Sequence, residues 1–365
     1  MIISQPLPYK MNIQKLTENA ISLLKNLIET PSFSQEEENT ALLIAGWFLD
    51  NNIPFQRTKN NIWATNKHFD ESKPTLLLNS HHDTVKPNSA YTKDPFEAHV
   101  KDGKLYGLGS NDAGGCLVSL IATFTHFYDA KNLCYNIVIV ASAEEENSGK
   151  NGLNSMLPTI PHIDVAIVGE PTLMNLAVAE KGLVVFDAVV SGTPSHAAHP
   201  NNNNAIYNTI EVLQWFKDFK FEKTSEALGD VKMTVTQITA GKQHNVVPAH
   251  VDLVIDVRVN DAYSNQEIAD ILKDKSPCTE ITPRSLRLNS SAISSNHDLV
   301  KAGIAIGRET YGSPTLSDQA SLSCQSLKLG PGDSTRSHSA NEFIYVTEIE
   351  EGIQIYIELL NKVIV

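Results

Sequence analysis

The sequence predicts an α/β protein with a mixed, mostly parallel sheet flanked by helices and interrupted by a smaller inserted α+β domain. In the first half of the chain, short apolar runs alternate with segments of helical periodicity, which is typical of parallel sheets flanked by helices. After about residue 182 the pattern changes to β-branched and alternating runs. A length of 365 residues suggests about two domains, which we place at 1–182 with 289–365 and at 183–288.

The larger domain begins with helices and continues with buried strands. Apolar residues recur at helical spacing between residues 11 and 51, and Pro31 separates two helical runs. Helical patterns return at 114–129 and, at the end of the chain, at 347–365. Continuous apolar runs, as expected for strands covered on both faces, lie at 75–79, 136–143 and 165–168.

The inserted domain follows a β-α-β-β-α order that resembles a ferredoxin-like fold. The run at 183–192 is rich in β-branched residues, and those at 232–239 and 250–259 alternate as antiparallel strands do. Helical patterns at 204–217 and 264–273 complete the unit.

Composition argues against several classes of function. The formal net charge of −13 argues against general binding to nucleic acids or anionic membranes. The four cysteines are scattered without disulfide-framework or zinc-finger spacing, which favours a reducing compartment. We find no apolar leader at the N-terminus and no run of 18 apolar residues. The sequence therefore predicts a cytoplasmic protein without nucleic-acid or membrane partners.

The first polar run of interest is SHHDTV at residues 80–85, directly after a predicted strand. In α/β sheets, ligands bind in the crevice at the carboxyl ends of the strands. His81 and Asp83 are two residues apart, so their side chains point the same way on an extended segment. One can then bind a metal while the other orients it, as imidazole–carboxylate pairs around metals commonly do. The alternative is an ordinary polar turn.

Further acids and imidazoles stand at other strand ends and loops. Asp112 lies among glycines at a loop-to-helix junction, and Glu170 follows the third apolar run. Three adjacent acids at 144–146 follow the second run, and His338 comes from a distant loop. Each has an ordinary alternative, a helix N-cap for Asp112 and a solvated loop for the others. Together with His81 they form a nitrogen and oxygen donor set that suits zinc, cobalt or manganese.

Taken in order, these HxD, D, EE, E and H elements resemble the M20 family of zinc-dependent metallopeptidases and amidohydrolases, over nearly the whole chain. The resemblance implies two Zn²⁺ ions per subunit, for which Co²⁺ can substitute. It also implies that Asp112 bridges the two ions and that Asp83 orients His81. The implied ligands of one ion are Glu145 and His338, and those of the other are His81 and Glu170.

The run of three glutamates allows two alignments. If Ala143-Glu144-Glu145 matches the family's Asp-Glu-Glu, Glu144 is the implied general base and Glu145 the ligand. We prefer this register. In the alternative, one residue later, Glu145 is the base and Glu146 the ligand.

The inserted domain carries further marks of the family. The GTPSHAAHP run at 192–200 implies that His196 hydrogen-bonds the developing oxyanion, commonly in the partner subunit of a homodimer; the alternative is an ordinary loop histidine. The NVVP and DxR segments imply that Asn245 and Arg258 contact substrate. Arg336 is another candidate partner for a substrate carboxylate, since a guanidinium binds carboxylates bidentately. A pair between Arg336 and an acid such as Asp333 is equally consistent with the sequence.

The length and the short insertion most resemble the acetylornithine deacetylase branch of the family. We therefore expect a metal-dependent hydrolase of linear amides that deacylates an N-acyl amino acid, such as N-acetyl-L-ornithine or N-acetyl-L-citrulline, in arginine biosynthesis. The alternatives are a succinyl-diaminopimelate desuccinylase and a dipeptidase or carboxypeptidase. An alternative of another class is a non-catalytic relative that binds amino-acid derivatives, and the complete set of ligands argues against it.

Overall fold

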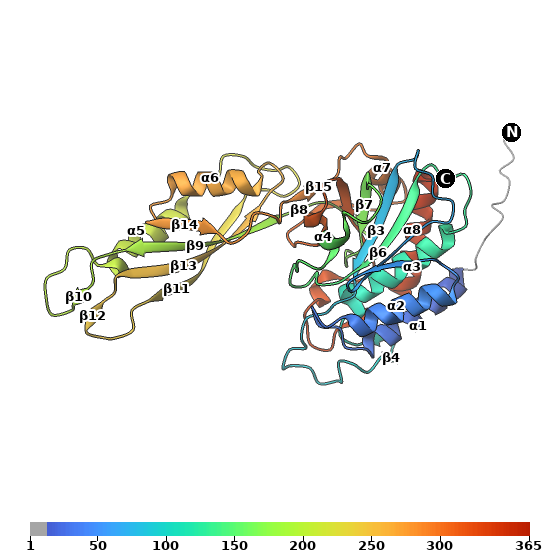
Figure 1. The fold of residues 1–365 in the computed structure, drawn as a ribbon, viewed down its shortest axis with the longest axis horizontal. Coiled ribbons are helices and arrows are strands. Elements are labelled where there is room, and N and C mark those ends of the chain that lie inside the picture. The colour runs from blue at the N-terminus through green and yellow to red at the C-terminus, as the bar shows by residue number, and fades with distance from the viewer. Residues whose placement is uncertain (1–12) are drawn as a thin grey trace. The chain divides into compact units, whose positions relative to one another are not determined.

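The computed structural model describes residues 13–365, which form two compact units. The first unit contains residues 13–178 together with 293–311 and 317–365, and the second contains 179–292 and 312–316. The predicted fold class is confirmed, because a mixed and mainly parallel sheet with helices is accompanied by a separate antiparallel sheet (Figure 1). Residues 1–12, on which the expectation of no leader depends, lie outside the described residues.

The central sheet of the first unit has the strand order β1-β2-β6-β3-β7-β17-β8. Strands β6, β3, β7 and β17 run parallel to one another, whereas β1, β2 and β8 are antiparallel to their neighbours. The register pairs His81 with Ser142 and Asn79 with Val168, so β3, β6 and β7 end at the same edge. The strands are β1 (Gln56–Thr58), β2 (Asn61–Thr65), β3 (Thr75–His81), β6 (Asn136–Ser142), β7 (Val165–Val168), β8 (Leu176–Glu180) and β17 (Gln325–Lys328).

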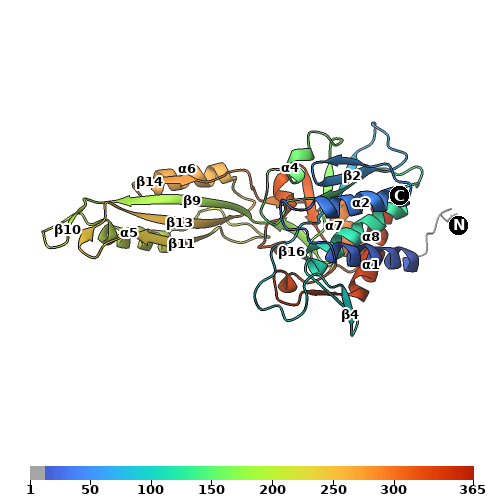
Figure 2. The ribbon, with the colours of Figure 1, turned by 60° about the horizontal axis from the view of Figure 1, so that its bottom comes forward.

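Both faces of this sheet are covered. Leu76 and Leu78 of β3 pack into a core built with α1, α3 and α8, whereas Leu77 packs on the other face with Met156 of α4. This two-sided burial explains why the strands read as continuous apolar runs. In Figure 1, α1, α3 and α8 lie side by side, and Figure 2 shows α2 next to α1. The helices are α1 (Ile13–Ile28), α2 (Glu38–Asp50), α3 (Gly115–Phe127), α4 (Leu153–Met156), α7 (Asp298–Ala305) and α8 (Val346–Val363).

A small sheet brings the C-terminal part of the chain beside the segment that precedes α3. Its order is β18-β5-β4, with Phe343 opposite Tyr106. The sequence patterns did not predict these short strands. Their bounds are β4 (His99–Lys101), β5 (Lys104–Tyr106) and β18 (Phe343–Tyr345). A further short strand, β16 (Thr310–Ser313), pairs with β8 and is not part of this small sheet.

The second unit contains a four-stranded antiparallel sheet of order β11-β13-β9-β14. Alternate residues of β9 and β13 point to one face, where they form a core with side chains of α5 and α6. A two-stranded ribbon, β10 with β12, and strand β14 were absent from the sequence prediction. The elements are β9 (Gly182–Ser191), β10 (Ser195–His196), α5 (Ala205–Asp218), β11 (Lys232–Ala240), β12 (Val246–Val247), β13 (His250–Val259), α6 (Asn265–Lys275), β14 (Glu280–Pro283) and β15 (Ser291–Ala292).

Among the described residues, no helix combines the length and the apolar character that crossing a bilayer requires.

Candidate metal centre

The candidate site lies at the edge of the first unit's sheet where the parallel strands end. His81 is the last residue of β3, Glu145 and Glu146 follow β6, and Glu170 follows β7. Asp112 lies in the turn before α3, and its backbone dihedral angles are not helical. The parallel strand order therefore gathers residues that are far apart in the sequence, as the crevice rule for α/β sheets predicts.

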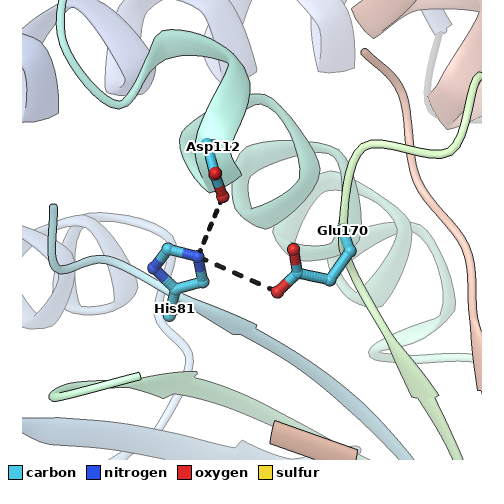
Figure 3. A group of neighbouring side chains, drawn as sticks. All are labelled: His81, Asp112 and Glu170. Atoms are coloured by element: carbon cyan, nitrogen blue, oxygen red, sulfur yellow. Dashed lines mark hydrogen bonds and ion pairs between the residues drawn. The ribbon is translucent and has the colours of Figure 1, made fainter. Parts of the chain in front are cut away.

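One group of ligand atoms joins His81, Asp112 and Glu170 (Figure 3). His81 Nε2 lies 3.3 Å from Asp112 Oδ1 and 3.8 Å from Glu170 Oε1. All three ligand atoms lie within 4.8 Å of one another. The His81 ring is buried, and Asp112 and Glu170 are only slightly exposed.

A second group joins Asp112, Glu146 and His338. His338 Nε2 lies 2.9 Å from Glu146 Oε2 and 3.5 Å from Asp112 Oδ2. The two oxygens of Asp112 thus face different imidazoles, Oδ1 toward His81 and Oδ2 toward His338. This is the arrangement that a carboxylate bridging two cations requires.

The structure shows which residues of the glutamate run lie at the centre. Glu146, and not Glu145, lies beside His338. The Glu144 carboxylate faces away from the centre and accepts hydrogen bonds from Asn151 N at 3.1 Å and Nδ2 at 2.7 Å. The cause is a turn at Glu144, whose φ of 56° ends the extended alternation of β6. Glu145 Oε2 lies 3.9 Å from His81 Nε2, so the geometry agrees with the later register.

Asp83 supports both His81 and the glutamate turn. Its backbone oxygen lies 2.9 Å from His81 Nδ1, and its Oδ1 lies 3.4 Å from the same nitrogen. The carboxylate also accepts the backbone N–H groups of Glu145 at 3.0 Å and Glu146 at 3.1 Å, and the Ser34 hydroxyl at 2.6 Å. Asp83 therefore fixes the ring of one candidate ligand and the backbone of another, which is the kind of support that metal ligands need.

Burial makes a negative charge costly at the carboxylates of this site. It raises the pKa of Glu170 to about 8. It also raises the pKa of Glu145 well above its ordinary value, and the charges of Glu170 and Asp318 act in the same direction. A group of acids in this state favours a nearby cation.

The pKa values of the two imidazoles are raised as well, and for an imidazole this favours the charged form. Burial acts to lower the pKa of His81, yet hydrogen bonds with Asp112 and Asp83 raise it well above the ordinary value. The hydrogen bond to Glu146 raises the pKa of His338 to about 9. The site therefore attracts positive charge at the positions where imidazole nitrogens and carboxylate oxygens converge. A pair of divalent cations of the zinc type fits this donor set.

The Arg336 guanidinium is paired with an acid, which is one of the two interpretations that the sequence allows. Its two terminal nitrogens donate to the Glu348 carboxylate at 2.7 and 2.8 Å. The guanidinium also lies 4.9 Å from the ring centre of Phe343 and 5.2 Å from that of Tyr345. The partner acid is thus Glu348 and not Asp333, and Arg336 serves to hold the start of α8.

The remaining predicted residues belong to the second unit. His196 and Asn245 lie on neighbouring segments, because β10 pairs with β12 and Ala197 N donates to Asn245 O at 3.0 Å. Both are exposed. Arg258 on β13 forms a bidentate pair with Asp256, with distances of 2.9 and 3.1 Å.

Two buried acids near the centre were given no role by the sequence analysis. Asp318 Oδ2 accepts hydrogen bonds from Asn79 Nδ2 at 2.9 Å and Ser142 Oγ at 2.5 Å, which ties β3 to β6. Glu342 accepts backbone N–H groups of the Asp112 turn. The nearness of Glu342 to His338 in the sequence was a usable signal, whereas nothing around Asp318 in the sequence indicated its position.

Comparison with known proteins supplies a family. The family model described as "Peptidase family M20/M25/M40" matches residues 77–362. The chain is 28% identical to an acetylornithine deacetylase of Shigella sonnei, covering 93% of this chain and 97% of the relative. It is 26% identical to a succinyl-diaminopimelate desuccinylase of Rickettsia bellii, covering 82% and 83%. An M20 family metallo-carboxypeptidase from Sulfolobus solfataricus shares the fold, with a TM-score of 0.74, 17% identity, and coverage of 94% of this chain and 98% of that one.

Proposed function

The chain belongs to peptidase family M20/M25/M40 and is a metallohydrolase of that family, and on this premise we propose that it removes the acyl group from an N-acyl amino acid. The proposed substrates are N-acetyl-L-ornithine and N-acetyl-L-citrulline, and the proposed pathway is arginine biosynthesis. The observation that carries the hydrolase chemistry is the position of Asp112 between two imidazole–carboxylate groups. The acetylornithine deacetylase relative supports the acetyl substrate, since the match covers nearly all of both chains.

We assign two Zn²⁺ ions, replaceable by Co²⁺, to the two groups. His81 and Glu170 would hold one ion, Glu146 and His338 the other, and Asp112 both. When bound, such a pair lowers the pKa of water and polarises the scissile carbonyl.

The general base in this proposal is Glu145. Its carboxylate lies at the centre without belonging to either ligand group, and its backbone N–H is held by Asp83. Burial raises its pKa well above the ordinary value, and a group that first accepts and later donates a proton needs a raised pKa. Glu145 would take a proton from the attacking water and deliver it to the leaving nitrogen.

We further propose a homodimer that forms through the second unit. Ile206, Tyr207 and Ile210 are 45%, 69% and 65% exposed on α5, and β11 is an edge strand with an exposed Ile238. Apolar side chains and an open edge on one unit favour association with a second copy. His196 would then donate a hydrogen bond to the developing oxyanion in a partner's site. Asn245, Arg258 and Arg336 remain the proposed substrate contacts, and each guanidinium would have to share its charge with the acid that it pairs with, Asp256 for Arg258 and Glu348 for Arg336.

A panel of amides tests the substrate assignment. The purified chain, supplied with Zn²⁺ or Co²⁺, is assayed on N-acetyl-L-ornithine, N-acetyl-L-citrulline, N-succinyl-diaminopimelate and dipeptides. We expect kcat/KM for an acetyl substrate to exceed the others by about tenfold or more, as a shape-matched pocket achieves. A preference for the succinyl substrate would instead place the chain with the desuccinylase that it also matches. Failure to hydrolyse any amide with metal bound would favour a non-catalytic binding protein.

A further inference from the structure

The Glu342 carboxylate is buried, with 2% of the residue exposed, and it faces the turn that carries Asp112. Its Oε1 accepts the backbone N–H groups of Asn111 at 2.8 Å and Asp112 at 2.9 Å. Its Oε2 accepts the N–H of Gly109 at 3.2 Å. The backbone oxygen of Glu342 also accepts the N–H of Gly107 at 3.1 Å. One residue thus accepts four backbone N–H groups between residues 107 and 112.

These donors belong to a stretch that regular secondary structure does not satisfy. Asp112 and Ala113 have φ values of −116° and −117°, which are not helical. A buried N–H group without an acceptor costs about 1–3 kcal/mol. A carboxylate that accepts several N–H groups forms stronger, charge-assisted hydrogen bonds than a neutral acceptor would. The shape of the turn therefore depends on Glu342.

Glu342 also links the turn to the segment that carries His338, which lies four residues earlier. A second connection lies nearby, because Asn111 Nδ2 donates to Asp333 O at 3.1 Å and Asp333 N donates to Asn111 Oδ1 at 3.1 Å. Hydrogen bonds within the protein therefore hold the Asp112 turn and the His338 segment together without a metal ion.

We propose that Glu342 is a positioning residue that presets Asp112 to face both ligand groups. This inference rests on the metal centre of the proposed function. Because Asp112 is shared, loss of Glu342 weakens the binding of both ions together. Loss of a ligand that belongs to one group, such as His338, affects mainly one ion. The pattern over the two ions therefore distinguishes a positioning role from the loss of a ligand.

The test compares Glu342→Gln with the natural chain. Glutamine keeps the size of the side chain, but its NH2 group cannot accept a hydrogen bond. In either orientation of the amide, this group therefore faces a backbone N–H donor that loses its acceptor. Metal affinity is measured by calorimetry with Zn²⁺ and by the visible absorption of bound Co²⁺. Hydrogen exchange of the backbone amides at 109–112 is measured by mass spectrometry. We expect both dissociation constants to rise by about 10–100-fold, the effect typical of groups that support metal ligands, and exchange at 109–112 to accelerate.

The matched control is Glu348→Gln. Glu348 is also a largely buried acid of the C-terminal segment, but its carboxylate accepts hydrogen bonds from Arg336 and from the backbone N–H of Tyr345. This control should keep both metal affinities. Unchanged affinities and exchange in Glu342→Gln, or equal losses in both variants, would overturn the proposal.

Two further outcomes are informative. If Glu342→Gln does not fold, Glu342→Asp keeps the charge but shortens the side chain, and it should show a smaller increase in both dissociation constants. An Asp variant that folds with natural affinities would refute the proposal. If the natural chain binds neither ion, the proposed function fails, and faster exchange confined to 109–112 in Glu342→Gln would still support the positioning of the turn.

Discussion

At the scale of single residues, the site depends on which of three adjacent glutamates faces the centre. Glu144 faces Asn151, Glu145 approaches His81, and Glu146 reaches His338. Three identical residues give the same chemistry in either register, so the preference for the earlier register rested on the alignment with the family alone. The choice comes from the left-handed backbone of Glu144, which follows from the tertiary contacts of this loop.

The first prediction separates these neighbours by charge-neutral substitution. Glu145→Gln should lower kcat by about 10²–10⁴ because the group that accepts the proton is lost, while metal content stays near two ions per chain. The matched control, Glu144→Gln, should retain most activity, since this side chain interacts with Asn151 outside the centre. Steady-state kinetics with metal analysis checks both variants. Full activity in Glu145→Gln together with an inactive Glu144→Gln would restore the earlier register.

Four residues of the two ligand groups, His81, Asp112, Glu170 and His338, were named from the sequence. They were recognisable because each stands directly after a strand or in a glycine-rich or polar loop. Asp318 and Glu342 were not assigned, because their importance comes from burial and from partners more than 170 residues away. No local pattern encodes such partners.

At the scale of elements, the long buried strands were the most predictable part of the fold. β3, β6 and β7 are covered on both faces, and this burial makes them continuous in apolar character. β1, β4 and β5 have three residues each, too few for periodicity to be recognised, and their pairing comes from the tertiary fold. The sequence therefore predicted the sheet edge that carries the site more accurately than it predicted the short peripheral strands.

The second prediction concerns the connection between β3 and β6. Asp318→Ala removes the acceptor of two buried donors, on Asn79 and Ser142, and each donor left alone costs about 1–3 kcal/mol. Urea unfolding should therefore show a larger loss of stability for Asp318→Ala than for Ser142→Ala, which removes only one donor.

The double variant provides the control. Because Asp318 and Ser142 share a hydrogen bond, their effects on the free energy of unfolding should not add, and a double-mutant cycle should give a nonzero coupling energy. Additive losses would show that the connection contributes nothing.

At the scale of the whole molecule, the two units have separate hydrophobic cores. The second unit exposes the apolar side chains of Ile206, Tyr207 and Ile210 on α5.

The third prediction uses two side chains of equal exposure. Ile210 on α5 and Leu49 on α2 are both 65% exposed. Ile210→Glu should convert the proposed dimer to a monomer in sedimentation velocity, because it places a charge in the apolar patch of the second unit. Leu49→Glu should leave the dimer intact. A natural chain that sediments as a monomer and is fully active would rule out the shared site.

The fourth prediction concerns metal removal. A ligand present at 100 times its dissociation constant stabilises the folded state by about 2.7 kcal/mol. Chelation should therefore lower the unfolding temperature of the first unit, and addition of Zn²⁺ should restore it. The second unit, which has its own core, should be unaffected. Calorimetry can resolve this difference, and identical traces with and without chelator would contradict the assignment.

The sharing of Asp112 has a consequence for how the enzyme responds to metal supply. In the proposed centre, the first ion to bind would be attracted by the negative charge of this side chain, so the second would bind with a weaker stepwise constant. When zinc is scarce, the population should consist mainly of singly occupied chains. The rate of hydrolysis would then depend on binding of the second, weaker ion. It would change with the free zinc concentration in the range of that ion's dissociation constant.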